Sequence, residues 1–263
     1  MREKVNGFVG VMAVAILCMV SGLCMVWGIA PVVLAVYVAA CAVCGRYMIT
    51  CIGCAAGVAA GSMGIAGLLH AYEYMIPGPA YSGVMVTEKY LVLLGLAMCL
   101  MKIVYSRNSR SYVRVIVVMS AAGLMGNIVV YADNMLMAAA YGVVEAAIFM
   151  CASVILKPGI GLLYTYICGD ASDVERDESW NISQGIVSLM ALAAVVLWVV
   201  PGEDIYGVNP AFMLALVLIL YAVYRTGAVY GCGMAAVAGS IVSVKLNDSR
   251  WLMWMLLVTL VML

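Results

Sequence analysis

The chain has 263 residues, of which 67% are hydrophobic and 10% are charged, and its formal net charge is zero. Its mean hydropathy is +1.14. A water-soluble domain of this length needs a far larger polar surface, so the composition excludes an ordinary soluble protein and indicates one that is dissolved in lipid. We expect the lipid bilayer as its main partner and no nucleic-acid partner.

The hydropathy pattern favours helices over strands. Alternation of polar and apolar residues is missing, which argues against an outer-membrane barrel. Backbone groups in hydrocarbon must be hydrogen-bonded internally, so we expect an all-α, polytopic transmembrane helix bundle. About ten spans are predicted, several of them short, at residues 7–27, 29–44, 47–69, 90–105, 113–131, 136–156, 186–200, 211–224, 227–244 and 251–263.

The two ends of the chain carry separate signals. Arg2 and Lys4 precede the first apolar run, which is long and lacks a clear cleavage site, so we interpret it as an uncleaved first helix. The last apolar run continues to Leu263. We therefore expect a chain that is truncated at its C-terminus, the membrane part of a longer protein.

The basic residues predict the orientation. With a cytoplasmic N-terminus and alternating loops, only Lys89, Lys245 and Arg250 fall on the outer side. The other ten basic residues fall on the cytoplasmic side, as the positive-inside rule requires. Both termini are then cytoplasmic. The cytoplasmic set is Arg2, Lys4, Arg46, Lys102, Arg107, Arg110, Arg114, Lys157, Arg176 and Arg225.

One polar stretch interrupts the apolar pattern. We expect a single transmembrane domain over residues 1–263, with possible sub-bundles at 1–156 and 185–263 joined by a cytoplasmic linker at 157–184. Residues 158–168 are apolar but too short to span, which suggests an interfacial or re-entrant segment. The acidic part of the linker is interpreted either as solvated chain or as a docking surface for a cytoplasmic partner.

Glycine spacing predicts close helix contacts. Glycines four residues apart lie on one face of a helix and let two backbones approach, which drives helix association in lipid. The sequence leaves open whether this packing occurs within the bundle or between chains. The candidate positions are Gly53, Gly57, Gly61, Gly227, Gly231 and Gly239.

Glu145 is the one acidic residue near the middle of a predicted span. A charge there costs at least about 2.5–3.5 kcal/mol, so the carboxyl group should be neutral or paired. Asn127 on the preceding helix and Tyr141 one turn earlier are the expected hydrogen-bond partners. Glu145 is therefore either a satisfied structural residue or an ion-linked site, such as a proton or cation site.

The sequence predicts no catalytic group, metal site or cofactor. Cys41, Cys44, Cys51 and Cys54 have a four-thiolate spacing, but all lie in or beside apolar spans, where thiolates are costly and cysteine behaves as a small hydrophobe. Phosphate-binding, zinc-protease and serine-hydrolase motifs are missing. We therefore expect this chain, as given, not to be an enzyme.

Two segments near the end carry a family resemblance. Residues 180–208 read WNISQGIVSLMALAAVVLWVVPGEDIYGV, and residues 212–244 read FMLALVLILYAVYRTGAVYGCGMAAVAGSIVSV. The first segment has a polar lead-in to a span and then a short turn, and the second has a tyrosine-rich turn followed by a Gly/Ala-rich helix. This pattern resembles the membrane region of stage II sporulation protein E. That family has ten spans, a Gly/Ala-rich ninth span and a cytoplasmic C-terminus.

The resemblance implies a role. The family anchors a metal-dependent serine/threonine phosphatase at the sporulation septum of endospore-forming Firmicutes, where it dephosphorylates an anti-anti-sigma factor and so activates a sigma factor. A central region self-associates and contacts a tubulin-like division protein. This chain stops where those regions would begin, so no phosphatase residue is carried over. The resemblance implies a plasma-membrane anchor without its enzyme; the alternative is a small-solute or proton-coupled ion transporter that uses Glu145.

Overall fold

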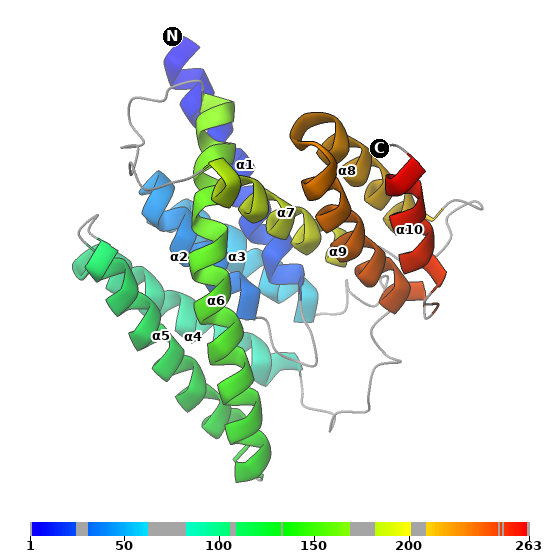
Figure 1. The fold of residues 1–263 in the computed structure, drawn as a ribbon. Helices are drawn as coiled ribbons and strands as arrows, with labels where there is room; N and C mark the ends of the chain where they lie inside the picture. Colours follow the sequence, from blue (N-terminus) through cyan, green and yellow to red (C-terminus); the bar gives the residue numbers. More distant parts are fainter. Residues whose placement is uncertain are drawn as a thin grey trace.

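The computed structural model describes residues 2–24, 31–62, 83–105, 109–132, 134–168, 182–200, 209–246, 248 and 250–261. Every regular element in these residues is an α-helix, which confirms the predicted all-α class (Figure 1). In chain order the helices are α1 (Arg2–Leu23), α2 (Pro31–Cys44), α3 (Tyr47–Ser62), α4 (Gly83–Ile103), α5 (Ser109–Val130), α6 (Met135–Cys168), α7 (Ile182–Val199), α8 (Pro210–Thr226), α9 (Ala228–Leu246) and α10 (Arg250–Val261).

Three helices in the described part of the chain are long and apolar enough to cross a membrane. They are Arg110–Val130 in α5, Met135–Ile167 in α6 and Ala228–Leu246 in α9. Further apolar helices are shorter, between 10 and 17 residues. Length and composition thus bear out a membrane-type helical chain, whereas the number of spans and their orientation stay predictions.

Helix α4 begins earlier than expected. The predicted span started at residue 90, but the helix begins at Gly83. The prediction that Lys89 lies in an outer loop is therefore wrong, because the helix begins six residues before it. In the structure Lys89 lies in the second turn of α4 and is buried.

Helix α6 is longer than predicted. It continues through Pro158 to Cys168, so residues 158–168 are the last part of this helix and not a separate interfacial segment. Proline lacks an N–H and normally breaks or kinks a helix. Here the next residue, Gly159, donates its N–H to Ser188 Oγ of α7 at 2.6 Å, which ties this part of α6 to the neighbouring helix. Most of the predicted acidic linker, residues 169–181, lies outside the described residues.

The helix ends follow from local chemistry. Asn209 precedes α8, and its side chain accepts a hydrogen bond from the N–H of Phe212 at 2.9 Å, while Pro210 fills the first helical position. Gly227 has a φ of 87° and stops α8 before α9 begins. The prediction that Gly227 belongs to a packing face of α9 is therefore wrong, because a positive φ takes it out of the helix.

Hydroxyl groups inside these apolar helices bond to their own backbone. Ser120, Ser153 and Thr259 each donate to the carbonyl oxygen four residues earlier, at 2.7 to 2.9 Å. A buried hydroxyl without a partner is costly in an apolar medium. This local bonding lets polar residues occupy apolar helices without recruiting water.

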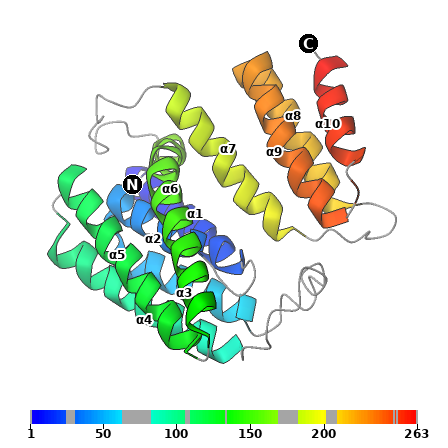
Figure 2. The same cartoon turned by 60° about the horizontal axis from the view of Figure 1, so that its bottom comes forward.

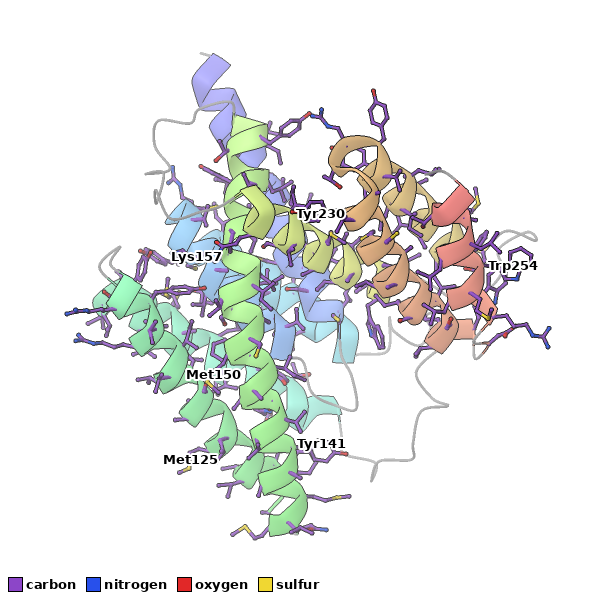
Figure 3. All side chains as sticks on the ribbon, in the orientation of Figure 1. Met125, Tyr141, Met150, Lys157, Tyr230 and Trp254 are labelled. Atoms are coloured by element: carbon purple, nitrogen blue, oxygen red, sulfur yellow. The ribbon has the colours of Figure 1, made fainter. Side chains whose placement is uncertain are left out.

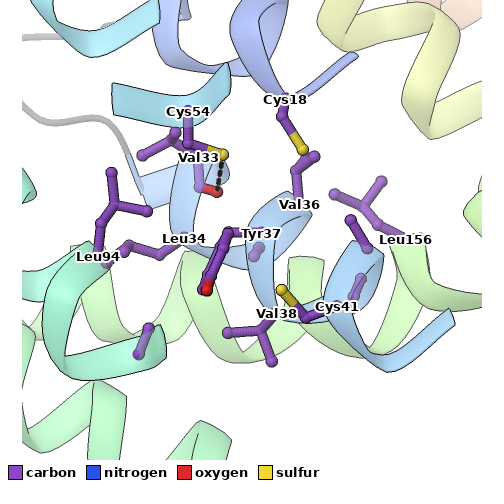
Figure 4. Packing of buried hydrophobic residues seen from close by; sticks show 14 of the residues in the cluster. Cys18, Val33, Leu34, Val36, Tyr37, Val38, Cys41, Cys54, Leu94 and Leu156 are labelled. Atoms are coloured by element: carbon purple, nitrogen blue, oxygen red, sulfur yellow. Dashed lines mark hydrogen bonds between the residues drawn. The ribbon is translucent and has the colours of Figure 1, made fainter. Parts of the chain in front are cut away.

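The buried side chains form two clusters. The larger one surrounds α2, whose residues from Val33 to Cys41 are all at most 2% exposed, with α1, α3, α4 and α6 packed around it (Figure 4). A helix that is apolar on every side must be buried on every side. The smaller cluster joins α7, α8, α9 and α10, and Figure 2 shows α7 lying between the two groups.

Glycines bring α1 and α3 into backbone contact. A Cβ built on Gly53 would lie 2.6 Å from the carbonyl oxygen of Ala15, and one on Gly57 would overlap the carbonyl oxygen of Met19. A Cβ on Gly22 of α1 would lie 2.6 Å from the backbone N of Val58. The two helices therefore use these glycines inside the chain, which is one of the two alternatives left open by the sequence. Gly61 lies in the last turn of α3 and is half-buried.

The glycines of α9 pack against its neighbours. A Cβ on Gly231 would overlap the side chain of Val223 in α8, and one on Gly239 would lie 3.0 Å from Leu252 Cδ1 and 3.2 Å from Met255 Cβ in α10. Both glycines therefore act within the second cluster. Helix α9 can approach α8 and α10 closely because these positions carry no side chain.

Replacing Gly57 by alanine tests the α1–α3 contact. The new Cβ overlaps a backbone carbonyl, so we expect α1 and α3 to separate and the free energy of unfolding to fall by about 1–3 kcal/mol. The measurement is reversible unfolding of the purified protein in detergent. The matched control is Gly95→Ala in α4, where a Cβ meets nothing within 4 Å. Equal stability of the two variants would contradict the close contact.

Candidate functional site

Four polar side chains come together where α4, α5 and α6 meet. Glu145 of α6 is only 2% exposed, and Lys89 and Tyr90 of α4 and Asn127 of α5 are also buried. Charged side chains are almost never fully buried unless they are paired. We call these four side chains the polar cluster. Its Lys89–Glu145 pair is the one buried ion pair among the described residues.

The side chains of the polar cluster engage both carboxylate oxygens of Glu145. Lys89 Nζ lies 2.5 Å from Oε2 and forms an ion pair with it. Asn127 Nδ2 donates to the same oxygen at 2.5 Å, and the Tyr90 hydroxyl donates to Oε1. Lys89 Nζ also donates to Asn127 Oδ1 at 3.0 Å. The acid therefore accepts from three side chains on two other helices.

The surroundings of Lys89 are adapted to its charge and its length. Its ammonium group lies 4.8 Å from the centroid of the Tyr90 ring, which adds a cation–π attraction. Its aliphatic part runs past Gly126 of α5, where a Cβ would approach Lys89 Cγ to 3.3 Å. A buried charge without a partner costs several kcal/mol. The pairing thus makes burial of both residues possible.

The polar cluster lies nearer one end of the helices than the other. On the far side, Lys102 follows Lys89 by thirteen residues and Lys157 follows Glu145 by twelve, which corresponds to about 18–20 Å of helix. On the near side, Tyr131 and Tyr141 stack with centroids 5.0 Å apart, about one helical turn, or roughly 6 Å, from Asn127 and Glu145. Glu145 is therefore not at the midpoint between these flanking residues.

The structure brings together only part of the predicted site. Asn127 contacts Glu145, but Tyr141 stacks on Tyr131 instead (its position is marked in Figure 3). Sequence reasoning missed Lys89 and Tyr90. The sequence did contain a signal for Lys89. A carboxylate buried in membrane-type helices requires a cation as its partner, and Lys89 directly precedes the predicted span that begins at residue 90.

The four cysteines of the spaced pattern lie on α2 and α3. Cys41 Sγ lies 3.3 Å from Thr50 Oγ1, and Cys54 Sγ lies 3.8 Å from the carbonyl oxygen of Val33. Cys44 and Cys51 are half-buried, and neither forms a disulfide. Among the residues that the structure describes, no group of three or more His, Cys, Asp or Glu side chains is arranged to hold a metal ion.

Replacing Glu145 by glutamine tests the polar cluster. Lys89 would keep its charge in a buried site without a counter-ion, so we expect a loss of about 3–5 kcal/mol in the free energy of unfolding. The measurement is unfolding in detergent. Glu88→Gln is the control, because Glu88 is exposed one residue from Lys89 and should change stability by at most about 0.5 kcal/mol. An equally small effect at Glu145 would contradict the ion pair.

Comparison with known proteins gives no relative on which to base a function. No family model, no curated protein and no solved structure matches the chain. The functional argument therefore depends on the chemistry of the helices and on the contacts of the polar cluster.

Proposed function

We propose that this chain is a non-catalytic membrane anchor and assembly domain. It spans the plasma membrane several times, holds a cytoplasmic C-terminal domain at the membrane and self-associates there. Following the resemblance to stage II sporulation protein E, the attached domain is a metal-dependent serine/threonine phosphatase, and the destination is the sporulation septum. Division or sporulation proteins are the partners that this proposal implies.

The observation that carries the proposal is that the hydrogen bonds of Glu145 and Lys89 are made within the chain. Both oxygens of Glu145 are occupied by donors from this chain, and Lys89 is bonded to two of its neighbours. A site that takes up an ion or a solute needs ligand atoms that can exchange partners. A carboxylate whose bonds all run to neighbouring helices instead serves to fasten α4, α5 and α6 together.

The cavity between the helices also fits an anchor better than a carrier. A groove of about 410 Å³ lies between α2, α6 and α7, and its lining does not include Glu145. Its walls are apolar side chains such as Ile148, Leu156 and Val195. Hydrocarbon fills such a groove well, whereas a polar solute would lose its hydration there without compensation.

Self-association belongs to the proposal, but on surfaces other than those first expected. Gly53 and Gly57 are covered by α1, and Gly231 and Gly239 are covered by α8 and α10. Contact between chains therefore has to use outward-facing apolar side chains, such as Val117 and Met125 of α5 or Trp254 of α10. Side chains of this kind are equally suited to face lipid.

A proton-coupled transporter that uses Glu145 is the second candidate. One observation favours it: an ion pair buried in membrane-type helices is by default a candidate functional site. If this candidate is correct, Glu145→Gln abolishes acid-driven uptake in vesicles that contain the purified protein. The anchor proposal expects no uptake that depends on Glu145 in the same vesicles.

The anchor proposal is tested by following the full chain in a sporulating cell. We expect a fluorescent protein fused after Leu263 to stay in the membrane fraction during alkaline extraction and to concentrate at the septum. Protease added to inverted vesicles should remove it, because the proposal places the C-terminus in the cytoplasm. Extraction into the soluble fraction would overturn the anchor, and a uniform distribution around the cell would overturn septal targeting.

A further inference from the structure

Basic side chains gather where α4 ends, α5 begins and α6 passes beside them. Lys102 lies in the last turn of α4, Arg110 and Arg114 lie near the start of α5, and Lys157 of α6 lies over Tyr112 of α5. We call this part of the three helices the basic end. The described acids of these helices, Glu88 and Glu145, are at least twelve residues away along the chain from Lys102 and Lys157.

Tyr112 organises the basic end of α4, α5 and α6. Its hydroxyl donates to the carbonyl oxygen of Ser153 at 2.7 Å, which joins α5 to α6. The ammonium of Lys157 lies 4.8 Å from its ring centroid (Lys157 is labelled in Figure 3), and the ring of Tyr105 meets it edge-on at 6.3 Å. Tyr112 therefore joins the start of α5 to α6 and fixes the position of Lys157 beside the end of the α4–α5 hairpin.

Cations and exposed apolar side chains alternate at this site. Lys102 and Arg114 are exposed, and so are their neighbours Ile103 and Val113. A soluble anion would satisfy the cations but leave the apolar side chains in water. A phospholipid satisfies both, because its phosphate meets the cations and its acyl chains cover the apolar neighbours. Tyrosine rings are also typical of the headgroup level.

We propose that the basic end of α4, α5 and α6 binds the headgroups of anionic phospholipids. The inference rests on the proposed membrane insertion and adds a lipid class to it. Clusters of basic side chains at one end of membrane helices attract anionic headgroups, and basic pockets between helices bind them. Lys102 and Arg114 supply exposed charges, and Tyr112 fixes the ammonium of Lys157 at the same end of α5.

The test measures lipid bound to the purified full chain. The protein in neutral detergent is mixed with phosphatidylglycerol or with phosphatidylcholine, and the bound lipid is quantified by mass spectrometry. We expect a preference for phosphatidylglycerol that weakens about fivefold for each charge removed in Lys102→Gln and Arg114→Gln. Binding of phosphatidylcholine should not change. The charge-conserving pair Lys102→Arg and Arg114→Lys should keep the preference, which controls for folding.

Arg225→Gln is the matched control for location. Arg225 is also exposed, but it lies in the last turn of α8, in the other cluster of helices. It should retain full preference for phosphatidylglycerol. The proposal is overturned if the unmodified chain shows no preference, if Lys102→Gln with Arg114→Gln leaves it intact, or if Arg225→Gln lowers it equally. These outcomes are independent of alkaline extraction and septal localisation, so failure of the anchor proposal would be recognised separately.

Discussion

The ion pair between Lys89 and Glu145 is the interaction on which the arrangement of α4, α5 and α6 depends. Helix α5 contacts both α4 and α6, and the surfaces of the three helices are mostly apolar. Between such helices in lipid the hydrophobic effect gives no drive to associate. Apolar packing alone does not select which helices pair or in which register. The polar cluster does, because its contacts form in only one pairing and one register. Asn127 adds α5 to the pair, so that a single group of four side chains fixes three helices.

Other helices of the bundle associate through close backbone contact. Gly22, Gly53 and Gly57 let α1 and α3 touch, and Gly231 and Gly239 place α9 against α8 and α10. Dispersion contacts between backbones replace the missing hydrophobic drive. The central helix α2 needs neither device, because it is enclosed on all sides by apolar side chains. Packing by glycines, enclosure of α2 and one polar cluster each hold part of the bundle together.

Part of this could be predicted from the sequence. Helical class, the approximate position of each helix and the pairing of Asn127 with Glu145 follow from hydropathy and from the cost of a buried charge. The early start of α4 was missed, because Lys89 directly precedes the predicted apolar run and its counter-ion Glu145 is distant in the sequence. The continuation of α6 through Pro158 was missed because proline normally ends a helix, and the bond from Gly159 to Ser188 joins residues that are distant in the sequence. Gly227 fits a packing motif by spacing, and only its φ of 87° identifies it as a turn residue.

Glu145 and Lys89 form an ion pair in the interior of the helices. The most direct measurement is the infrared spectrum of the Glu145 carboxyl group in reconstituted protein, obtained as the difference from Glu145→Gln. The ion pair predicts the band of a carboxylate. The carbonyl band of a protonated acid would contradict it.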